Sequence, residues 1–568
     1  MSSAAWTYTA NTTASRTGGG ILEDTQASDA RRLGHFRQIL LWPLQLMPLR
    51  EGSQIHRHWA WLEEARPDNP WREVDDEFTD DPAGFQQRHY SEFVTFLPHV
   101  QRFLYGEGRT RGGAPGESPI RVFRRRDVAR VRCTYPGDAL APAEFDIAHI
   151  DLYFFFDLDI AVLNVELHGD DISLDCAQET LFRLGRAYPT YWESNGDPGH
   201  CLKRTEWLDA DGRVLATSDD EQRHAFLQHV SRYRAPRVAA HWDFLLQPLV
   251  PHHSDRSGPL RYRQLEYHRM PVMAYAAVDG DPRDLDASDF VRLGLITASG
   301  PPGRMPVRVP DFEQRFCYDR FWVPQAGGTP GSRYMGCGES FVLVGSARVP
   351  YFYTPGGSLL EEFRHQYFLL FLIPHMHKAA LLMMSDRLVY ALKRLDIQDP
   401  ETIKRFKREI RQLREIFLRF THRYWFHRVS DQIQARDLYR KTAEFLATEE
   451  LYEEVRQRVQ DMAEYLEEDT GRRQANTVLR LTVVTAFGLI GTTVTGYFGM
   501  NILELDGLSP VARTLYFLVI FAGMTWLTFY TVMKSKGLSD FLDALSDERV
   551  SIGRKLGALL GVWRRPRG

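Results

Sequence analysis

The chain has 568 residues, of which 43% are hydrophobic and 25% are charged, and its formal net charge is −4. A chain of this length buries one large core or two smaller ones, and its slightly acidic balance excludes the basic surface of a typical nucleic-acid-binding protein. The cysteines form neither a CxxC pair nor a zinc spacing, which is typical of proteins from a reducing compartment.

The N-terminal segment predicts a disordered lead. Residues 1–33 are rich in Ser, Thr, Ala and Gly, and they contain no apolar run of the kind that forms the centre of a signal peptide.

Residues 34–358 predict an α/β cytoplasmic domain with insertions. Residues 39–46 have the apolar pattern of a buried strand, and residues 150–156 and 160–167 predict two strands joined by a tight turn. A helix is expected over 175–186, because acidic residues open the segment and apolar residues recur at helical spacing.

Glycine-rich segments follow in the same domain. Residues 277–310 and 325–332 predict loops or insertions, and the Gly-Cys-Gly-Glu-Ser sequence at 336–340 predicts a turn. No G-x-S-x-G, P-loop or G-x-G-x-x-G motif argues for catalysis, so we do not expect an enzyme.

Acidic residues and histidine pairs are the metal-site candidates of this domain. Two groups of carboxylates suit a hard divalent cation, although such side chains are more often simply solvated. They are Asp151, Asp157, Asp159, Glu166, Asp170 and Asp171, and Asp75, Asp76, Glu77, Asp80 and Asp81. The pairs His252–His253 and His375–His377 lack a third ligand, which favours surface or hydrogen-bonded histidines.

Residues 359–475 predict a helical stalk region. The apolar run 367–373 is too short to cross a membrane, and Pro374 is expected to end it. Residues 401–427 carry an apolar face within a highly charged segment, which indicates a long helix. A stalk helix is expected to follow, with either a bend or a tolerated glycine at Gly471.

Two long uncharged segments within residues 476–534 predict a transmembrane hairpin. About 20 apolar residues cross a bilayer core as a helix. We expect the spans at about 477–498 and 514–533, joined by an external loop over 502–513.

The charges around the hairpin predict its orientation. The cations that flank the two spans are Arg472, Arg473, Arg480, Lys534 and Lys536, whereas the connecting loop carries Glu504 and Asp506. Lys and Arg concentrate on the cytoplasmic side of a membrane, so both termini are expected in the cytoplasm. Residues 535–568 then form a basic cytoplasmic tail, either an amphipathic helix on anionic lipids or an ordinary tail.

One face of the first span is small and hydroxylated. Thr482 lies at the edge of a helical stripe that contains Thr485, Gly488 and Thr492, and bulky apolar residues lie on the opposite side. Such a face suits either close helix packing or the lining of a watery path, and the stripe alone leaves both interpretations open.

The sequence at the end of this span resembles a known signature. The motif Gly499-Met500-Asn501, with Phe498 before it and the pair Leu481-Thr482 upstream, is similar to that of the CorA family of magnesium transporters. The short acidic loop and the basic residues after the second span match as well. The resemblance covers roughly residues 400–536, and the length of the chain makes it an enlarged, divergent member.

The resemblance implies a CorA-like fold: an α/β cytoplasmic domain, a long helical stalk and a two-helix transmembrane hairpin in a funnel-shaped homo-oligomer, which the family forms as a pentamer. It implies a channel in a bacterial-type inner membrane that conducts Mg²⁺ passively and is gated by the cytoplasmic domain. The cation is then cargo, and no cofactor is expected.

Under this hypothesis Gly499, Met500 and Asn501 form the selectivity motif. A ring of Asn501 carbonyl groups would bind hydrated Mg²⁺ through its tightly held waters, and Gly499 would permit a tight turn. Thr482, Thr485 and Thr492 would line the pore. The acidic residues of the loop, Glu504 and Asp506, either concentrate cations at the mouth or remain solvated charges.

Two alternatives stay open. A transporter of the same fold would carry Zn²⁺, Co²⁺ or Ni²⁺, and a membrane-anchored sensor or scaffold would keep the fold without conducting. In each case the expected partners are further copies of the chain, membrane lipids and divalent cations.

Overall fold

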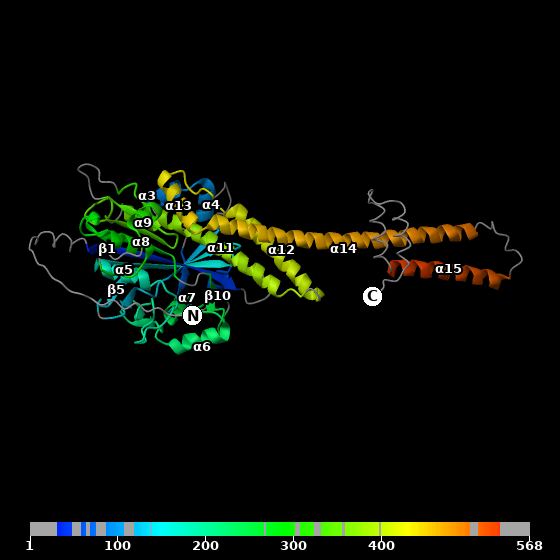
Figure 1. Cartoon of the computed structure of the whole chain (residues 1–568), viewed down its shortest axis with the longest axis horizontal. Coiled ribbons are helices and arrows are strands. Elements are labelled where there is room, and N and C mark those ends of the chain that lie inside the picture. Colours follow the sequence, from blue (N-terminus) through cyan, green and yellow to red (C-terminus); the bar gives the residue numbers. More distant parts are fainter. Residues whose placement is uncertain are drawn as a thin grey trace, which may run out of the picture. The chain divides into compact units, whose positions relative to one another are not determined.

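The computed structural model (Figure 1) describes residues 31–47, 58–63, 69–74, 87–106, 119–137, 139–258, 260–265, 269–301, 307–322, 331–354, 358–396, 399–499 and 509–533. The chain divides into two compact units, Met1–Gln457 and Arg458–Gly568. A mixed α/β domain with a large sheet comes first, and a long helix and a further C-terminal helix follow it in sequence.

The described strands form one sheet in the order β12-β13-β14-β11-β1-β6-β5-β4-β7-β8. Off this path, β10 pairs with β1 and β9, and β3 pairs with β5 and β2. Their bounds are β1 Arg32–Met47, β2 Trp71–Glu73, β3 Ile120–Arg125, β4 Arg130–Thr134, β5 Ala143–Phe155, β6 Ile160–Ser173, β7 Arg204–Leu208, β8 Val214–Thr217, β9 Val250–Pro251, β10 Arg261–Gln264, β11 Val272–Val278, β12 Cys317–Tyr318, β13 Arg333–Gly336 and β14 Ser340–Ser346.

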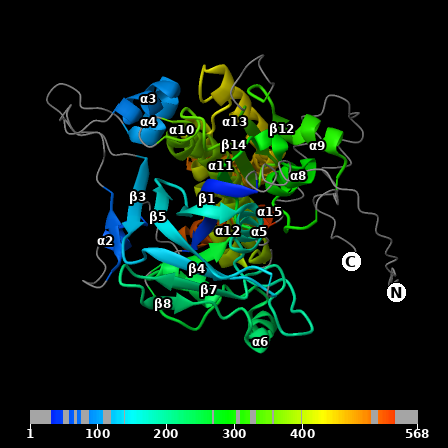
Figure 2. The ribbon, with the colours of Figure 1, turned by 90° about the vertical axis from the view of Figure 1, so that its left-hand side faces the viewer.

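Strand β1 is the centre of this sheet, with β4, β7 and β8 toward one end and β14 and β12 toward the other (Figure 2). It pairs antiparallel with β6 along one side, and with β11 and then β10 along the other. A proline inside a central strand normally breaks a ladder. Here Pro43 falls between the end of the β11 register at Leu40 and the start of the β10 register at Leu44.

The direction of the neighbouring amides explains why Pro43 is tolerated. The amide of Leu41 donates to the carbonyl of Pro271, at the edge of β11. Alternate residues of a strand point their amides the same way, so position 43 faces that side too. The missing N–H therefore coincides with the gap between the two partner strands.

The sequence-based prediction of two strands and a tight turn is confirmed by β5 and β6, which are joined at residues 156–159. The helix predicted next is α5, Leu174–Arg183. Its N-terminus is capped by Ser173, whose hydroxyl oxygen accepts from the amide of Cys176 at 3.2 Å. The predicted buried strand at 39–46 is the middle of β1, and the predicted turn at 336–340 joins β13 and β14.

The prediction of loops over 277–310 is wrong. Strand β11 runs to Val278, and helix α8 occupies Ala287–Leu295. The carboxylate of Asp286 accepts from the amide of Ser288 at 2.7 Å and so caps this helix. The acidic and polar residues that indicated a loop are the cap and first turn of a helix whose Val291 is fully buried.

The remaining helices alternate with the strands along the chain or follow the last strand, β14. Their bounds are α2 Ala60–Glu63, α3 Gln87–Thr95, α4 Pro98–Tyr105, α6 Arg223–Tyr233, α7 Ala240–Leu246, the short 3₁₀ turn η1 Pro282–Asp284, α9 Val309–Phe316, α10 Leu359–Glu362, the π-helical turn η2 Phe363–Tyr367, α11 Phe368–Lys393, α12 Pro400–Arg423, α13 Ile433–Phe445, α14 Thr448–Gly499 and α15 Pro510–Met533.

Helix α11 corrects the prediction that Pro374 ends a short apolar segment. Pro374 lies inside α11 and is buried. The helix packs against β1, β6, α12 and α13, and α11 and α12 run side by side in Figure 1. An interior proline costs a helix about 3 kcal/mol, and burial of apolar side chains on several faces of α11 offsets that cost.

Residues Leu359–Lys393 form a helical stretch that is long and apolar enough to cross a membrane, but 78% of its apolar window is buried inside the protein. It is therefore a core helix of the α/β domain.

Helix α14 is the longest described helix. It begins at Thr448 as a charged segment and continues without a break to Gly499, so Gly471 lies within a helix. Near its start, Tyr452 stacks on Trp425 with ring centroids 4.5 Å apart, and its hydroxyl donates to Thr421 at 3.4 Å.

The assignment of α11 as a core helix of the α/β domain can be tested by substitution of a buried and an exposed residue of this helix. Leu381 is 0% exposed on α11, whereas Val389 on the same helix is 46% exposed. Leu381→Asp should lower the free energy of unfolding by about 3–5 kcal/mol, because an unpaired charge would be buried. Val389→Asp should change it little. Thermal unfolding followed by tryptophan fluorescence distinguishes the two, and equal effects would contradict the assignment.

Candidate functional site

The predicted selectivity motif begins at the last residue of α14. Gly499 ends the helix, and Met500, Asn501, Glu504 and Asp506 lie outside the described residues. A side chain built at Gly499 would meet nothing within 4 Å in a single chain, and the same is true at Gly488, Gly491 and Gly496. The glycines of α14 therefore have open space beside them.

The three predicted pore-lining threonines are exposed on α14, and each hydroxyl donates to a carbonyl one turn earlier. Thr482 donates to Val478 at 2.9 Å, and Thr485 donates to Leu481 at 2.8 Å. Thr492 donates to Gly488 at 2.8 Å. A hydroxyl has one donor and two acceptor lone pairs. These side chains therefore present acceptor oxygens outward.

Large apolar side chains are exposed on the same helix and on α15. Leu481 is 68% exposed on α14, and Val511 and Trp526 of α15 are 75% and 66% exposed. Large exposed apolar side chains on two helices are typical of a surface that lipid or protein covers.

The carboxylates of the first predicted metal group are each bound to a basic side chain. Among the described residues, no group of three or more potential ligands is placed to hold a metal ion. The pairs are Asp151 with Arg124, Asp157 with Arg419 and Arg423, Asp159 with His58 and Arg387, Glu166 with Arg37 and Arg364, Asp170 with His35, and Asp171 with Arg32. The second group, residues 75–81, lies outside the described residues.

The histidine pair of α11 is structural, as predicted. His375 bonds through Nε2 to the carbonyl of Gly338 at 3.0 Å, and His377 bonds to the carbonyl of Tyr424. Burial lowers the pKa of each to about 3, so both are neutral.

A chain of alternating charges connects the sheet to the helices, and no local sequence pattern predicts it. Glu166 on β6 lies between Arg37 of β1 and Arg364 of η2, whose Nε is 2.7 Å from Glu166 Oε1. Burial alone would raise the pKa of Glu166, but Arg364 and Arg37 outweigh it and lower the pKa to about 2. The carboxylate is therefore ionised between two guanidinium groups.

The same turn η2 continues this chain through His365. His365 Nδ1 lies 3.1 Å from Glu92 Oε2, and its Nε2 lies 3.6 Å from Glu361. Burial would lower its pKa, but the two carboxylates raise the pKa to about 9. Tyr105 of α4 donates to Glu92 at 2.6 Å. The π-helical turn η2, a rare element often found at functional sites, thus carries two of the cations of the network, Arg364 and His365.

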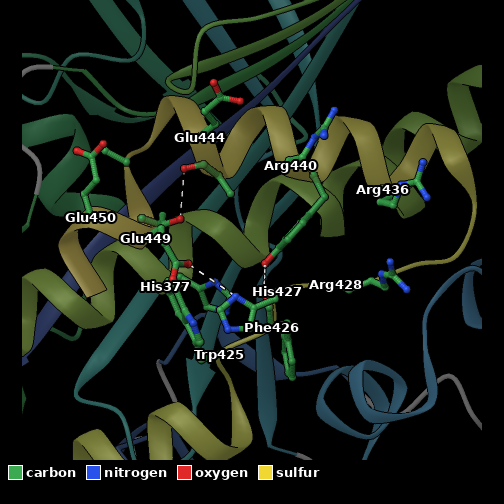
Figure 3. A pocket seen from close by; sticks show the side chains of 14 residues that line it. His377, Trp425, Phe426, His427, Arg428, Arg436, Arg440, Glu444, Glu449 and Glu450 are labelled. Carbon is green, nitrogen blue, oxygen red and sulfur yellow. Dashed lines mark hydrogen bonds and ion pairs between the residues drawn. The ribbon is translucent and has the colours of Figure 1, made fainter. Parts of the chain in front are cut away.

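A pocket of about 640 Å³ lies where α13 meets α14 (Figure 3). Arg428, Arg436 and Arg440 are on its lining, together with Glu444, Glu449 and Glu450. Between α13 and α14, Ala447 takes a left-handed conformation with φ of 50°.

In sequence, the α/β domain is followed by helix α14, which carries no charged residue from Leu481 to Phe498, and then by the apolar helix α15. Residues 389–534 match the family model described as CorA-like Mg²⁺ transporter protein, so this part of the chain is similar to the transporters of that family. Transporters of this family are membrane proteins and not enzymes, and they bind divalent cations. No curated protein and no solved structure gave a match.

The position of His365 predicts a pH dependence of stability. The pKa of this histidine rises from 6.5 to about 9 on folding. Its contribution is therefore fully present below pH 6.5 and is lost as the pH rises through 9, by about 2–3 kcal/mol in total. His365→Gln should remove this loss from a series of urea unfolding curves between pH 6 and 9.5.

The matched control for that series is His422→Gln, at an exposed position on α12. It should reproduce the wild-type profile. A wild-type profile that is flat over this range would contradict the assigned charge of His365.

Proposed function

We propose that the protein is a homo-oligomeric Mg²⁺ channel of the inner membrane, with a pore lined by the C-terminal part of α14. The observation that carries this proposal is the match of residues 389–534, which contains the Gly499-Met500-Asn501 motif after the end of α14. Two spans in one chain do not enclose a pore, so conduction requires a ring of copies, a pentamer by the resemblance.

The surface of the second unit supports this assembly. The exposed apolar side chains of α14 and α15 need lipid or neighbouring copies around them. The open space beside Gly488 and Gly491 suits the close approach of another helix, since small residues allow helix backbones to pack tightly in membranes. The uncharged segments place the proposed spans at about 477–498 and 514–533, and the flanking charges place both termini in the cytoplasm.

The threonine geometry supports a path for a hydrated cation. Each hydroxyl hydrogen of Thr482, Thr485 and Thr492 is used within the helix, so lone pairs face outward. Mg²⁺ keeps several of its waters, and those waters donate hydrogen bonds. Acceptor oxygens along the wall, with Asn501 carbonyls at the mouth and Glu504 and Asp506 beyond them, would guide such an ion without removing its water.

Magnesium influx into proteoliposomes loaded with a Mg²⁺-sensitive dye tests this proposal. Wild-type protein should conduct Mg²⁺, and Asn501→Ala should change the flux at least tenfold, since even a single lost hydrogen bond to the hydrated ion is worth about 1.4 kcal/mol. Oligomer size, measured by light scattering, should stay the same.

The two alternatives are outcomes of this experiment. Flux of Zn²⁺, Co²⁺ or Ni²⁺ in place of Mg²⁺ would identify a transporter of another ion. A well-folded ring that passes none of these ions would indicate a sensor or scaffold.

A second variant tests the proposed pore lining. Thr485→Val keeps the shape of the side chain and removes the acceptor, so flux should fall by roughly threefold to tenfold if that oxygen contacts the hydrated ion. Thr514→Val, on α15, is the control because Thr514 also bonds to the carbonyl one turn earlier, at 3.0 Å. Equal flux in the two variants would contradict a pore lined by the threonine face of α14.

A further inference from the structure

The pocket between α13 and α14 has two oppositely charged ends. In Figure 3, Arg428 and Arg436 lie toward one end, Glu449 and Glu450 lie toward the other, and Trp425 and Phe426 lie between them. Its volume of about 640 Å³ lies within the range of small-molecule sites.

The arginines of the pocket form only long ion pairs with other side chains of the protein. Arg428 lies 4.0 Å from Asp431, and Arg436 and Arg440 lie 3.7 and 3.9 Å from Asp437. These separations exceed hydrogen-bond distance, so the planar donors of the guanidinium groups are available to a ligand. Guanidinium groups bind phosphate oxygens through two parallel hydrogen bonds.

The carboxylates at the other end are equally available. Glu449 Oε2 lies 3.7 Å from His427 Nδ1, and both side chains are about 70% exposed. Neither Glu444 nor Glu450 has a side-chain hydrogen bond or ion pair with the residues that the structure describes. An anion alone would be repelled by this end of the pocket, and a cation alone would be repelled by the arginines.

A ligand with a negative group at one end and a cation at the other would complement both ends of the pocket. Mg²⁺ is usually bound by one or two carboxylates together with phosphate groups of its ligand, and it keeps several waters. We propose that this pocket binds a Mg²⁺-complexed polyphosphate, with the phosphates on the arginines and the hydrated metal beside Glu449 and Glu450.

The pocket recognises the metal and the phosphates rather than a base. The one tryptophan on its lining, Trp425, stacks on Tyr452 and lies 4.8 Å from the ring of His377, so its faces are already in use. Magnesium complexes of nucleoside triphosphates and of inorganic pyrophosphate should therefore bind with similar affinity, because both present the same metal-bound phosphates.

The location gives this binding a consequence for transport, which rests on the proposed function. The pocket includes the first turn of α14, and that helix continues to Gly499. A ligand that binds both Arg440 of α13 and Glu450 of α14 would restrain the angle between these two helices, which are connected through Ala447. It would thereby bias the helix that carries the proposed pore residues.

Calorimetric titration of the full-length protein in detergent tests the binding itself. The probes are Mg·ATP, Mg·pyrophosphate, MgCl₂ alone, and ATP with EDTA. We expect the two magnesium complexes to bind with similar affinity, at least tenfold more tightly than either MgCl₂ or metal-free ATP. Arg436→Gln with Arg440→Gln should weaken both complexes at least tenfold, and Glu449→Gln with Glu450→Gln should remove the advantage of adding Mg²⁺.

The matched controls are Arg213→Gln and Glu401→Gln, whose side chains are exposed elsewhere in the domain and should leave binding unchanged. Equal binding of metal-free ATP would overturn the proposal in favour of an anion site, and tight binding of MgCl₂ alone that Glu449→Gln with Glu450→Gln abolishes would overturn it in favour of a cation site. Absence of binding by all probes would also overturn it. The titration needs no ion flux, so loss of influx with intact binding would contradict the channel and leave this site standing.

Discussion

The junction between sheet and helices depends on one buried carboxylate. Glu166 of β6 holds Arg37 of the central strand β1 and Arg364 of the π-helical turn η2, which leads directly into α11. Removing one partner of such a buried pair typically costs about 3–5 kcal/mol, because the remaining charge is left without compensation. Through Arg364, Glu166 thereby links the sheet to the turn that leads into α11. Glu361 and His365 carry the same alternation of charges outward to Glu92 of α3.

Local patterns predicted the parts of the fold whose structure is decided locally. The apolar run in β1, the turn between β5 and β6, and the capped helix α5 each have a short-range signature in the sequence, and each is confirmed. The helices that were missed depend on distant contacts. Pro374 ends a helix in isolation, but tertiary packing around α11 outweighs its local cost. Helix α8 was hidden because its capping aspartates have the composition of a loop.

The candidate sites also differ in whether their residues are close in sequence or come together only in the fold. The Gly499-Met500-Asn501 motif was recognisable because its residues are contiguous, and the matched region contains it. Carboxylates that are close in sequence, such as Asp157 and Asp159, suggested a metal group, yet each binds arginines from α11 or α12 that no local pattern reveals. The pocket beside α14 combines the segment around Trp425 with α13 and the start of α14. Its charges come together only when these elements fold, so no local sequence pattern predicts this pocket.

The order of the elements along the chain has a consequence for biosynthesis. Helix α11 and the turns before it are as apolar as a membrane segment, and they leave the ribosome before the segments proposed to cross the bilayer. Every described strand of the sheet precedes α11, so the surface that buries this helix is already synthesised when it emerges. Prompt docking of α11 on β1 and β6 would hide it from the insertion machinery. A nascent chain with a slowly folding sheet would instead expose a false membrane signal ahead of the true one.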